Sequence, residues 1–124
     1  MPIGLTQTVE PTSEPVTLAQ AKDHLHIDGS DHDDQLTLLI SAARWHVEGY
    51  TNRQTMQATY KQTYDTWPGR TIELRMPPLQ SVTSVQYVDE NGATQTLAAS
   101  DYVVDTNSMP GRIVLDDDKN WPNL

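Results

Sequence analysis

The sequence predicts an α+β fold in which an N-terminal pair of helices precedes a small antiparallel β-sheet or hairpin region. Two observations support this prediction. Apolar residues recur at helical spacing from about 17 to 53, whereas residues 57–115 contain short alternating segments separated by turn residues. Because the helices come first and the strands follow, the order favours α+β over alternating βα units.

The chain begins with an arm. Residues 1–16 contain three prolines and show neither a helical nor a strand period, so we expect this segment to be extended or mobile. Residues 17–124 should form a single domain, because a chain of 124 residues suits one hydrophobic core.

The helical part opens with a capping box. Thr17 is followed three residues later by Gln20, so each side chain can satisfy a backbone amide of the first turn. This helix should end near Ile27. A second helix should start at Ser30 or Asp31, with carboxylates in its first turn, where the helix dipole favours negative charge. Its predicted apolar face consists of Leu36, Leu39, Ile40, Ala43, Val47 and Tyr50.

Short stretches rich in β-formers predict the strands, and the strongest of them is 81–88. Asn91-Gly92 follows it as a hairpin turn, because both residues tolerate positive φ. A second hairpin is expected around the loop 107–111. The predicted strands are 58–64, 72–74, 81–88, 94–97, 102–104 and 112–115.

Composition restricts the possible functions. Seventeen acidic against eight basic residues give a formal net charge of -9, which repels the phosphate backbone and argues against sequence-specific DNA binding. The same charge would keep a domain soluble, and on a channel wall it would prevent DNA from sticking. The absence of cysteine excludes disulfides and thiolate metal sites. No stretch is long and apolar enough to predict a membrane span, so no membrane partner is expected.

Enzymatic motifs are not found. His24 and His26 are two residues apart, so on a helix they point to different sides and do not share a metal. The acidic run 28–34 lacks the ligand pattern of a calcium loop. Neither a nucleophile elbow nor a glycine-rich phosphate loop is present. We therefore predict no catalytic residue, no bound cofactor and no metal site.

A series of short motifs runs through the chain from about Pro15 onward. The helical part contributes Leu18, Ala21, Lys22, Leu25, Asp33, Asp34, Ala42, Ala43, Val47, Glu48, Tyr50, Thr51 and Arg53. The strand part contributes a segment with a Pro-Pro-Leu sequence over 74–87, then Pro110-Gly111-Arg112-Ile113 and Trp121-Pro122. In order and spacing, these motifs resemble the phage head-to-tail connector proteins, the adaptor or head completion proteins of the virion.

The resemblance implies a virion structural protein that is not an enzyme. It implies a closed ring, a dodecamer, that binds the phage portal protein and a tail-side stopper or tail terminator protein. Double-stranded DNA would pass through the ring without sequence specificity. The expected location is the neck of the virion, after synthesis in the host cytoplasm. Two other classes remain open: an acidic DNA mimic that inhibits a nucleic-acid-binding protein, and a divalent-metal hydrolase.

Aromatic and charged residues supply a candidate subunit or partner interface. Trp45 lies off the predicted apolar face, so it either fills a second face against the sheet or anchors a neighbouring subunit. Arg44 and Glu48 are four residues apart and form either a surface ion pair or a contact that sets the register between subunits. Residues 67–70 predict an exposed turn. The candidate interface residues are Trp45, Arg44, Glu48, Trp67, Arg70 and Trp121.

Overall fold

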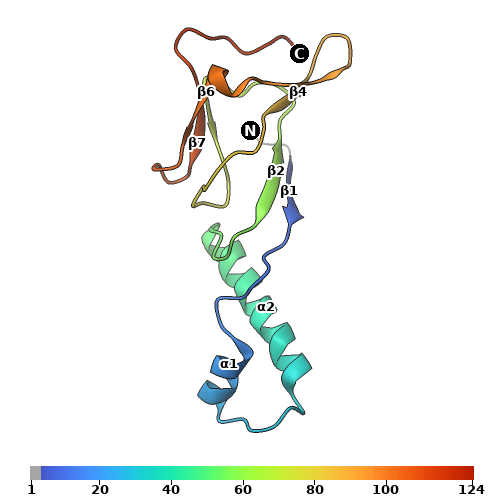
Figure 1. Cartoon of the computed structure of the whole chain (residues 1–124), viewed down its shortest axis with the longest axis vertical. Helices are drawn as coiled ribbons and strands as arrows, with labels where there is room; N and C mark the ends of the chain where they lie inside the picture. The colour runs from blue at the N-terminus through green and yellow to red at the C-terminus, as the bar shows by residue number, and fades with distance from the viewer. Residues whose placement is uncertain (1–3) are drawn as a thin grey trace. The chain divides into compact units, whose positions relative to one another are not determined.

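The computed structural model describes residues 4–124, and its elements are drawn in Figure 1. The chain divides into two compact units, Gln7–Tyr60 and Lys61–Leu124, the second of which also includes the residues up to Thr6. The predicted α+β class is confirmed, because two helices are followed by small antiparallel sheets.

The first helix, α1, spans Leu18–Leu25 and begins at the predicted capping box. The hydroxyl of Thr17 accepts a hydrogen bond from the backbone N–H of Gln20 at 3.1 Å. In return, the backbone N–H of Thr17 donates to Oε1 of Gln20 at 2.9 Å. The helix ends where His26 adopts a left-handed conformation with φ of 57°, slightly before the predicted end.

The second helix, α2, spans Asp33–Thr51 and starts later than predicted. Residues 30–33 form a turn instead, in which the backbone N–H of Asp33 donates to the carbonyl of Ser30 at 3.3 Å. Both expected carboxylates, Asp33 and Asp34, lie in the first turn. Within residues 4–124, no helix has the length and hydropathy needed to cross a membrane.

Lys22 connects the two helices. Its ammonium forms an ion pair with the carboxylate of Asp33 at the start of α2. The same group donates a 2.7 Å hydrogen bond to the carbonyl of Gly29 in the intervening turn. One cation on α1 therefore holds both the turn and the first residue of α2.

The N-terminal arm contains a strand that the sequence analysis did not predict. β1, Gly4–Val9, pairs with β2, Thr59–Thr63, in a two-stranded sheet. The pairing brings Gly4 so close to Thr63 that a Cβ at this glycine would lie 2.8 Å from the Thr63 hydroxyl. The arm is extended because its backbone pairs with a strand more than fifty residues away in the sequence.

A three-stranded antiparallel sheet contains most of the apolar core of the second unit. Its order is β3 (Thr71–Glu73), β7 (Arg112–Leu115) and β6 (Tyr102–Asp105), which confirms the second predicted hairpin. Ile72 lies opposite Ile113 in the register, and both side chains are buried. The buried hydrophobic residues of this unit are Ile72, Leu97, Ile113 and Leu115.

Tight packing next to this sheet requires a glycine. A Cβ added to Gly111 would lie 2.3 Å from Cβ of Leu79, a distance that no pair of side chains tolerates. The carbonyl of Gly111 also accepts a 2.8 Å hydrogen bond from the backbone N–H of Leu74. Gly111 is therefore a packing requirement of the motif in which it occurs.

The first predicted hairpin is present but shorter than expected. β4 spans Gln86–Val88 and pairs with β5, Thr94–Thr96, so the strand prediction for residues 81–85 is wrong. The backbone N–H of Leu97 still donates to the carbonyl of Val85 at 2.8 Å, but the returning chain then enters a short 3₁₀ helix at Ala99–Asp101, so the strand pairing does not continue. In the turn only Gly92 has positive φ, 79°, while Asn91 does not.

Apolar side chains are unevenly distributed between interior and surface. Among residues 4–124, five hydrophobic side chains are buried, whereas twelve large hydrophobic side chains are exposed. Single exposed apolar residues are ordinary, so the question is whether they gather on one face. On α2 they do.

Candidate subunit interface

The buried face of α2 differs from the predicted one. It passes through Leu36, Ile40, Arg44 and Glu48, at intervals of four residues. The predicted apolar face was correct for Leu36 and Ile40 and wrong for Leu39, Ala43, Val47 and Tyr50, which are exposed. The buried face lies at a different angle around the helix axis than predicted. It includes a charged pair that the sequence pattern had assigned to the surface.

That charged pair lies in a buried network. Arg44 and Glu48 are only 7% and 5% exposed. Nε of Arg44 donates to a carboxylate oxygen of Glu14 at 2.6 Å, and Nη1 donates to Glu48 at 3.1 Å. One guanidinium thus pairs with two carboxylates, one on its own helix and one from the segment that precedes α1. Buried charges need such partners, because desolvation alone would be costly.

Hydroxyl and amide donors complete the network. Ser41 donates its hydroxyl to Glu14 at 2.9 Å, and Thr55 donates both its hydroxyl and its backbone N–H to Glu48, at 2.7 and 3.1 Å. The hydrogen bond from Arg44 lowers the pKa of Glu14 below its ordinary value. The network therefore ties both the segment before α1 and the residues after α2 to the same helix face.

Tyr60 extends these contacts into β2. Its hydroxyl donates to Oε1 of Gln54 at 2.7 Å and accepts a 3.3 Å hydrogen bond from Nε2 of Gln7 in β1. Burial and the nearby charge of Glu48 raise the pKa of the Tyr60 hydroxyl. The ends of β1 and β2 within the helical unit are thereby linked to the loop that follows α2.

This network corrects the expectation of a surface ion pair at Arg44 and Glu48. Both side chains lie inside the subunit, and their hydrogen-bonding groups contact residues of the same chain. No sequence signal identified Glu14, because it is thirty residues away from Arg44 and lies in a segment without a period. The network positions α2 rather than contacting a partner directly.

The remaining surface of α2 carries two neighbouring exposed stripes. Stripe A consists of Leu38, Ala42, Trp45 and Gly49. Stripe B consists of Leu39, Ala43, His46 and Tyr50. In each stripe the residues follow at four, seven and eleven positions after the first, the spacing that keeps them on one side of a helix. All eight residues are exposed.

The large side chains of the stripes are among the most exposed apolar groups of the chain. Leu38 and Trp45 are 70% and 61% exposed, and Leu39 and Tyr50 are 54% and 84% exposed. The expectation that Trp45 fills a second internal face is therefore wrong, and the alternative, an anchor for a neighbouring subunit, stays a prediction.

Charge is absent from this outer surface. Between residues 35 and 52, Arg44 and Glu48 are the only formally charged residues at pH 7, and both are buried. The outer side of α2 therefore has no charged residue over most of the length of the helix, in a chain with a net charge of -9.

The other three candidate residues, Trp67, Arg70 and Trp121, lie together in the second unit, in a cluster that we call the clasp. The rings of Trp67 and Trp121 stack with centroids 4.4 Å apart and planes inclined by 4°. Each indole N–H donates to a backbone carbonyl: Trp67 to Pro122 at 2.8 Å and Trp121 to Gly69 at 2.6 Å. Arg70 donates a 2.8 Å bond to the carbonyl of Asp116.

The clasp changes the interpretation of the turn at 67–70. Residues 68–70 are exposed, as predicted for this turn, whereas Trp67 is half-buried and packs on the half-buried Trp121. Arg70 is exposed but donates to backbone carbonyls of its own chain. Their polar groups therefore hold residues 116–122 against the turn, and a contact with portal or tail proteins at this site stays a prediction.

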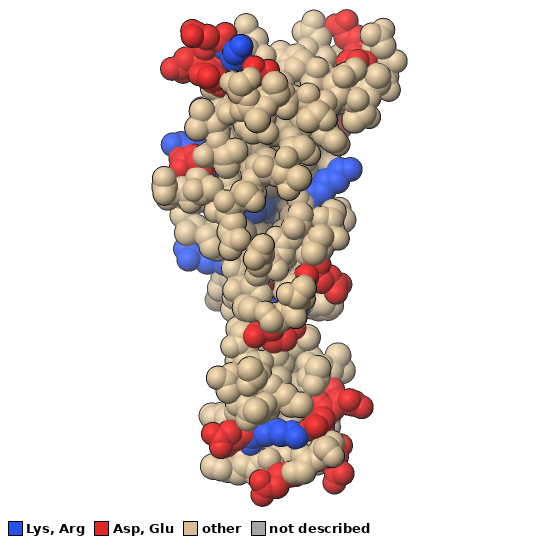
Figure 2. Space-filling view, viewed as in Figure 1, with Lys and Arg blue, Asp and Glu red and all other residues tan. Residues whose placement is uncertain are grey.

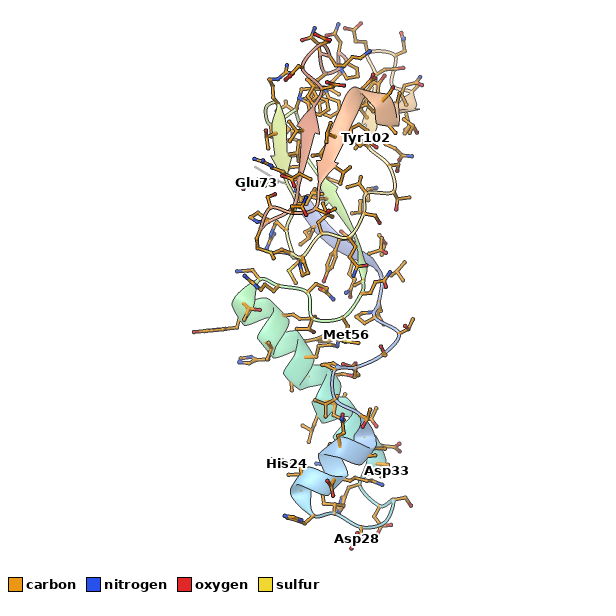
Figure 3. All side chains as sticks on the ribbon, turned by 60° about the vertical axis from the view of Figure 1, so that its left-hand side comes forward. His24, Asp28, Asp33, Met56, Glu73 and Tyr102 are labelled. Carbon is orange, nitrogen blue, oxygen red and sulfur yellow. The ribbon has the colours of Figure 1, made fainter. Side chains whose placement is uncertain are left out.

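Acidic side chains gather around the turn between α1 and α2, at the lower end of the view in Figure 2. Figure 3 labels His24, Asp28 and Asp33 in this region. Within residues 4–124, no three His, Asp or Glu side chains are grouped so that they could hold a metal ion. Asp33 instead forms the ion pair with Lys22.

Comparison with known protein families gives a match to the phage gp6-like head-tail connector proteins over residues 15–102. The chain belongs to this family. The match covers α1, α2, β2 to β5 and the first residue of β6, whereas β1 lies before the matched residues. No curated protein and no solved structure matches the chain. The connector protein is thus a structural component of the phage virion, as its sequence motifs predicted, although the motifs at 110–113 and 121–122 lie beyond the matched residues.

Proposed function

We propose that this connector protein forms a closed ring between the portal and the tail and extends the channel through which DNA leaves the capsid. The observation that carries the proposal is the outer surface of α2, with large exposed apolar side chains and no charge. A patch of this kind marks a protein contact, because water does not solvate it well. A head-to-tail connector that assembles in many copies would bury such a surface in the contacts between copies.

The proposed partners are other copies of the chain, the portal protein on the capsid side, and a stopper or tail terminator protein on the tail side. A ring closes only through head-to-tail contacts, so each copy needs two different complementary patches. By resemblance the ring is a dodecamer in the neck of the virion, assembled after synthesis in the host cytoplasm.

Passage of double-stranded DNA agrees with the net charge of -9. An acidic protein gains no affinity from releasing the counterions of DNA, and it repels the phosphates at short range. A duplex would therefore slide past without a stable, sequence-specific contact. A DNA mimic, by contrast, needs carboxylates along one extended face, and the longest helix of the chain has an uncharged outer side.

Electron microscopy of the purified protein mixed with the portal protein of the same phage tests the proposal. Particles are classified for rotational symmetry, with the portal alone as the control. The proposal predicts additional ring-shaped density at the tail end of the portal. A protein that stays monomeric and leaves the portal particles unchanged would contradict it.

A further inference from the structure

We propose that α2 of each copy is inserted between two neighbouring copies, with stripe A of one α2 facing stripe B of the next. The inference rests on the proposed ring and adds the residues through which it closes. Neither stripe is used within the subunit, since all eight positions are exposed.

Large apolar side chains of α2 lie outside its inward face. Its inward face packs in the subunit through Leu36 and Ile40, while the two stripes place Leu38, Leu39 and Trp45 outside. Exposed large apolar side chains that gather on one surface normally mark a protein contact. In the free subunit only one of three faces is covered, so two further faces remain to be covered on assembly.

The distribution of charge favours a second copy of the chain as the occupant. Two identical chains of net charge -9 repel each other overall. The outer side of α2 has no charged residue between 35 and 52, so a contact there brings together no like charges and desolvates no ion. A basic partner would instead be recognised by an acidic surface, which this face does not provide.

Side-chain size also suits a contact between the two stripes. Stripe A alternates the large Leu38 and Trp45 with the small Ala42 and Gly49. Stripe B has Ala43 between its larger members. Large side chains of one helix can therefore enter the gaps beside small residues of the other, as in ridges-into-grooves packing. Tryptophan and tyrosine are the residues that most often carry the energy of such contacts.

The two stripes differ in sequence and lie on adjacent sides of one helix, which favours a head-to-tail contact over a two-fold dimer. In a two-fold dimer every contact is reciprocal, so the pair closes on itself and the same contact cannot add a third copy. When stripe A meets stripe B, every copy uses both stripes, and the chain of contacts can close.

Cross-linking through introduced thiols tests the arrangement, and the chain offers a clean background because it has no cysteine. Ala42→Cys places a thiol in stripe A and Ala43→Cys places one in stripe B, both at exposed small residues. Thr37→Cys, exposed on α2 but outside the stripes, is the matched control. The variants carry tags of different mass and are treated with a short bismaleimide, alone and in pairs.

The proposal predicts that the mixture of Ala42→Cys and Ala43→Cys gives several-fold more cross-linked dimer than either variant alone or than any pair with Thr37→Cys. A chain with both cysteines should give a ladder of higher species. Equal cross-linking of Ala42→Cys with itself would overturn the proposal in favour of a two-fold contact. No excess in the mixture, at high concentration and on portal particles alike, would also overturn it.

A second experiment removes the apolar groups without adding charge. One variant carries Leu38→Gln with Trp45→Gln, and the other carries Leu39→Gln with Tyr50→Gln. Sedimentation of either variant alone should show loss of the larger assemblies, whereas their mixture should recover dimers and nothing larger. The control, Val88→Thr with Val103→Thr, removes two exposed apolar side chains from strands and should assemble as wild type.

The two experiments separate this inference from the proposed function. Selective cross-linking between the stripes in free protein, without any binding to portal, would retain the inference about α2 and contradict the connector ring at the portal. Binding to portal without contact between the stripes would do the reverse.

Discussion

The two compact units of this protein distribute charged and apolar side chains in opposite ways. In the unit of residues 61–124, the buried side chains of the sheet are aliphatic, and an ion pair joins the half-buried Asp105 to the exposed Arg112. In the helical unit, Arg44 and Glu48 are buried while Leu38, Trp45 and Tyr50 face outward.

The difference indicates what each unit is built for. A sheet with an aliphatic core is stable by the ordinary burial of apolar surface. The helical unit instead uses part of its interior for a hydrogen-bonded charge network and leaves large apolar side chains outside. That arrangement gives up hydrophobic burial in the subunit, and in the proposed ring this apolar surface would be buried against other copies.

Removing the guanidinium of Arg44 should cause the largest loss of stability. Arg44→Met leaves the carboxylates of Glu14 and Glu48 without their cation, and breaking a buried pair in this way costs about 3–5 kcal/mol. Arg112→Met breaks the exposed pair with Asp105 and should cost less than about 1 kcal/mol. Urea unfolding followed by circular dichroism measures both, and equal losses would show that the buried network has no special role.

A methyl group at Gly111 tests the packing of the second unit. Gly111→Ala forces a Cβ against Leu79, and overpacking of this kind typically costs about 1–3 kcal/mol. Gly49→Ala makes the same change in α2, where nothing lies within 4 Å, and should stabilise the helix by about 0.5–1 kcal/mol. Thermal unfolding should therefore move in opposite directions for the two variants. A neutral result at Gly111 would mean that the contact with Leu79 relaxes freely.

Acid should weaken the helical unit through Glu14. The pKa of this carboxyl is lowered from 4.5 by its bond to Arg44, so its stabilising contribution is present above about pH 5 and is lost as the pH falls through the folded-state value. Glu14→Gln should reduce the free energy of unfolding at neutral pH by roughly 1–2 kcal/mol, because Glu14 is only partly buried. The difference from wild type should shrink as the pH falls towards 3. If the difference in unfolding free energy from wild type does not change with pH, Glu14 does not contribute to the loss of stability in acid.

The capping box of α1 should give the smallest of these effects. Thr17→Ala removes the acceptor of the Gln20 amide and should cost about 1 kcal/mol, in line with other N-cap replacements. Thr12→Ala, at an exposed position of the arm, provides the control. If the two variants have the same unfolding midpoint, Thr17 is not a stabilising cap.

Local chemistry explains which elements the sequence predicted correctly. The capping box of Thr17 and Gln20 and the carboxylates in the first turn of α2 act within a few residues of each other, so they are visible in the sequence. The hairpin of β6 and β7 was predictable for the same reason. Family motifs added the connector assignment, which local patterns alone do not provide.

Long-range contacts explain the rest. The inward face of α2 depends on Glu14, and β1 exists because it pairs with β2, far along the chain. An Arg and a Glu four residues apart look identical on a solvated helix and in a buried network, so the pattern pointed to the surface. For the same reason the two outer stripes were not predicted, since Leu39 and Tyr50 had been assigned to the buried apolar face.

Oxidative footprinting of Trp45 and Tyr50, read by mass spectrometry, tests the central claim most directly. The protein is labelled free and then bound to portal particles, with Met109 as an exposed reference in the other unit. The account predicts that Trp45 and Tyr50 become several-fold protected in the assembly while labelling of Met109 changes little. An assembled ring in which Trp45 and Tyr50 remain as reactive as in the free protein would contradict it.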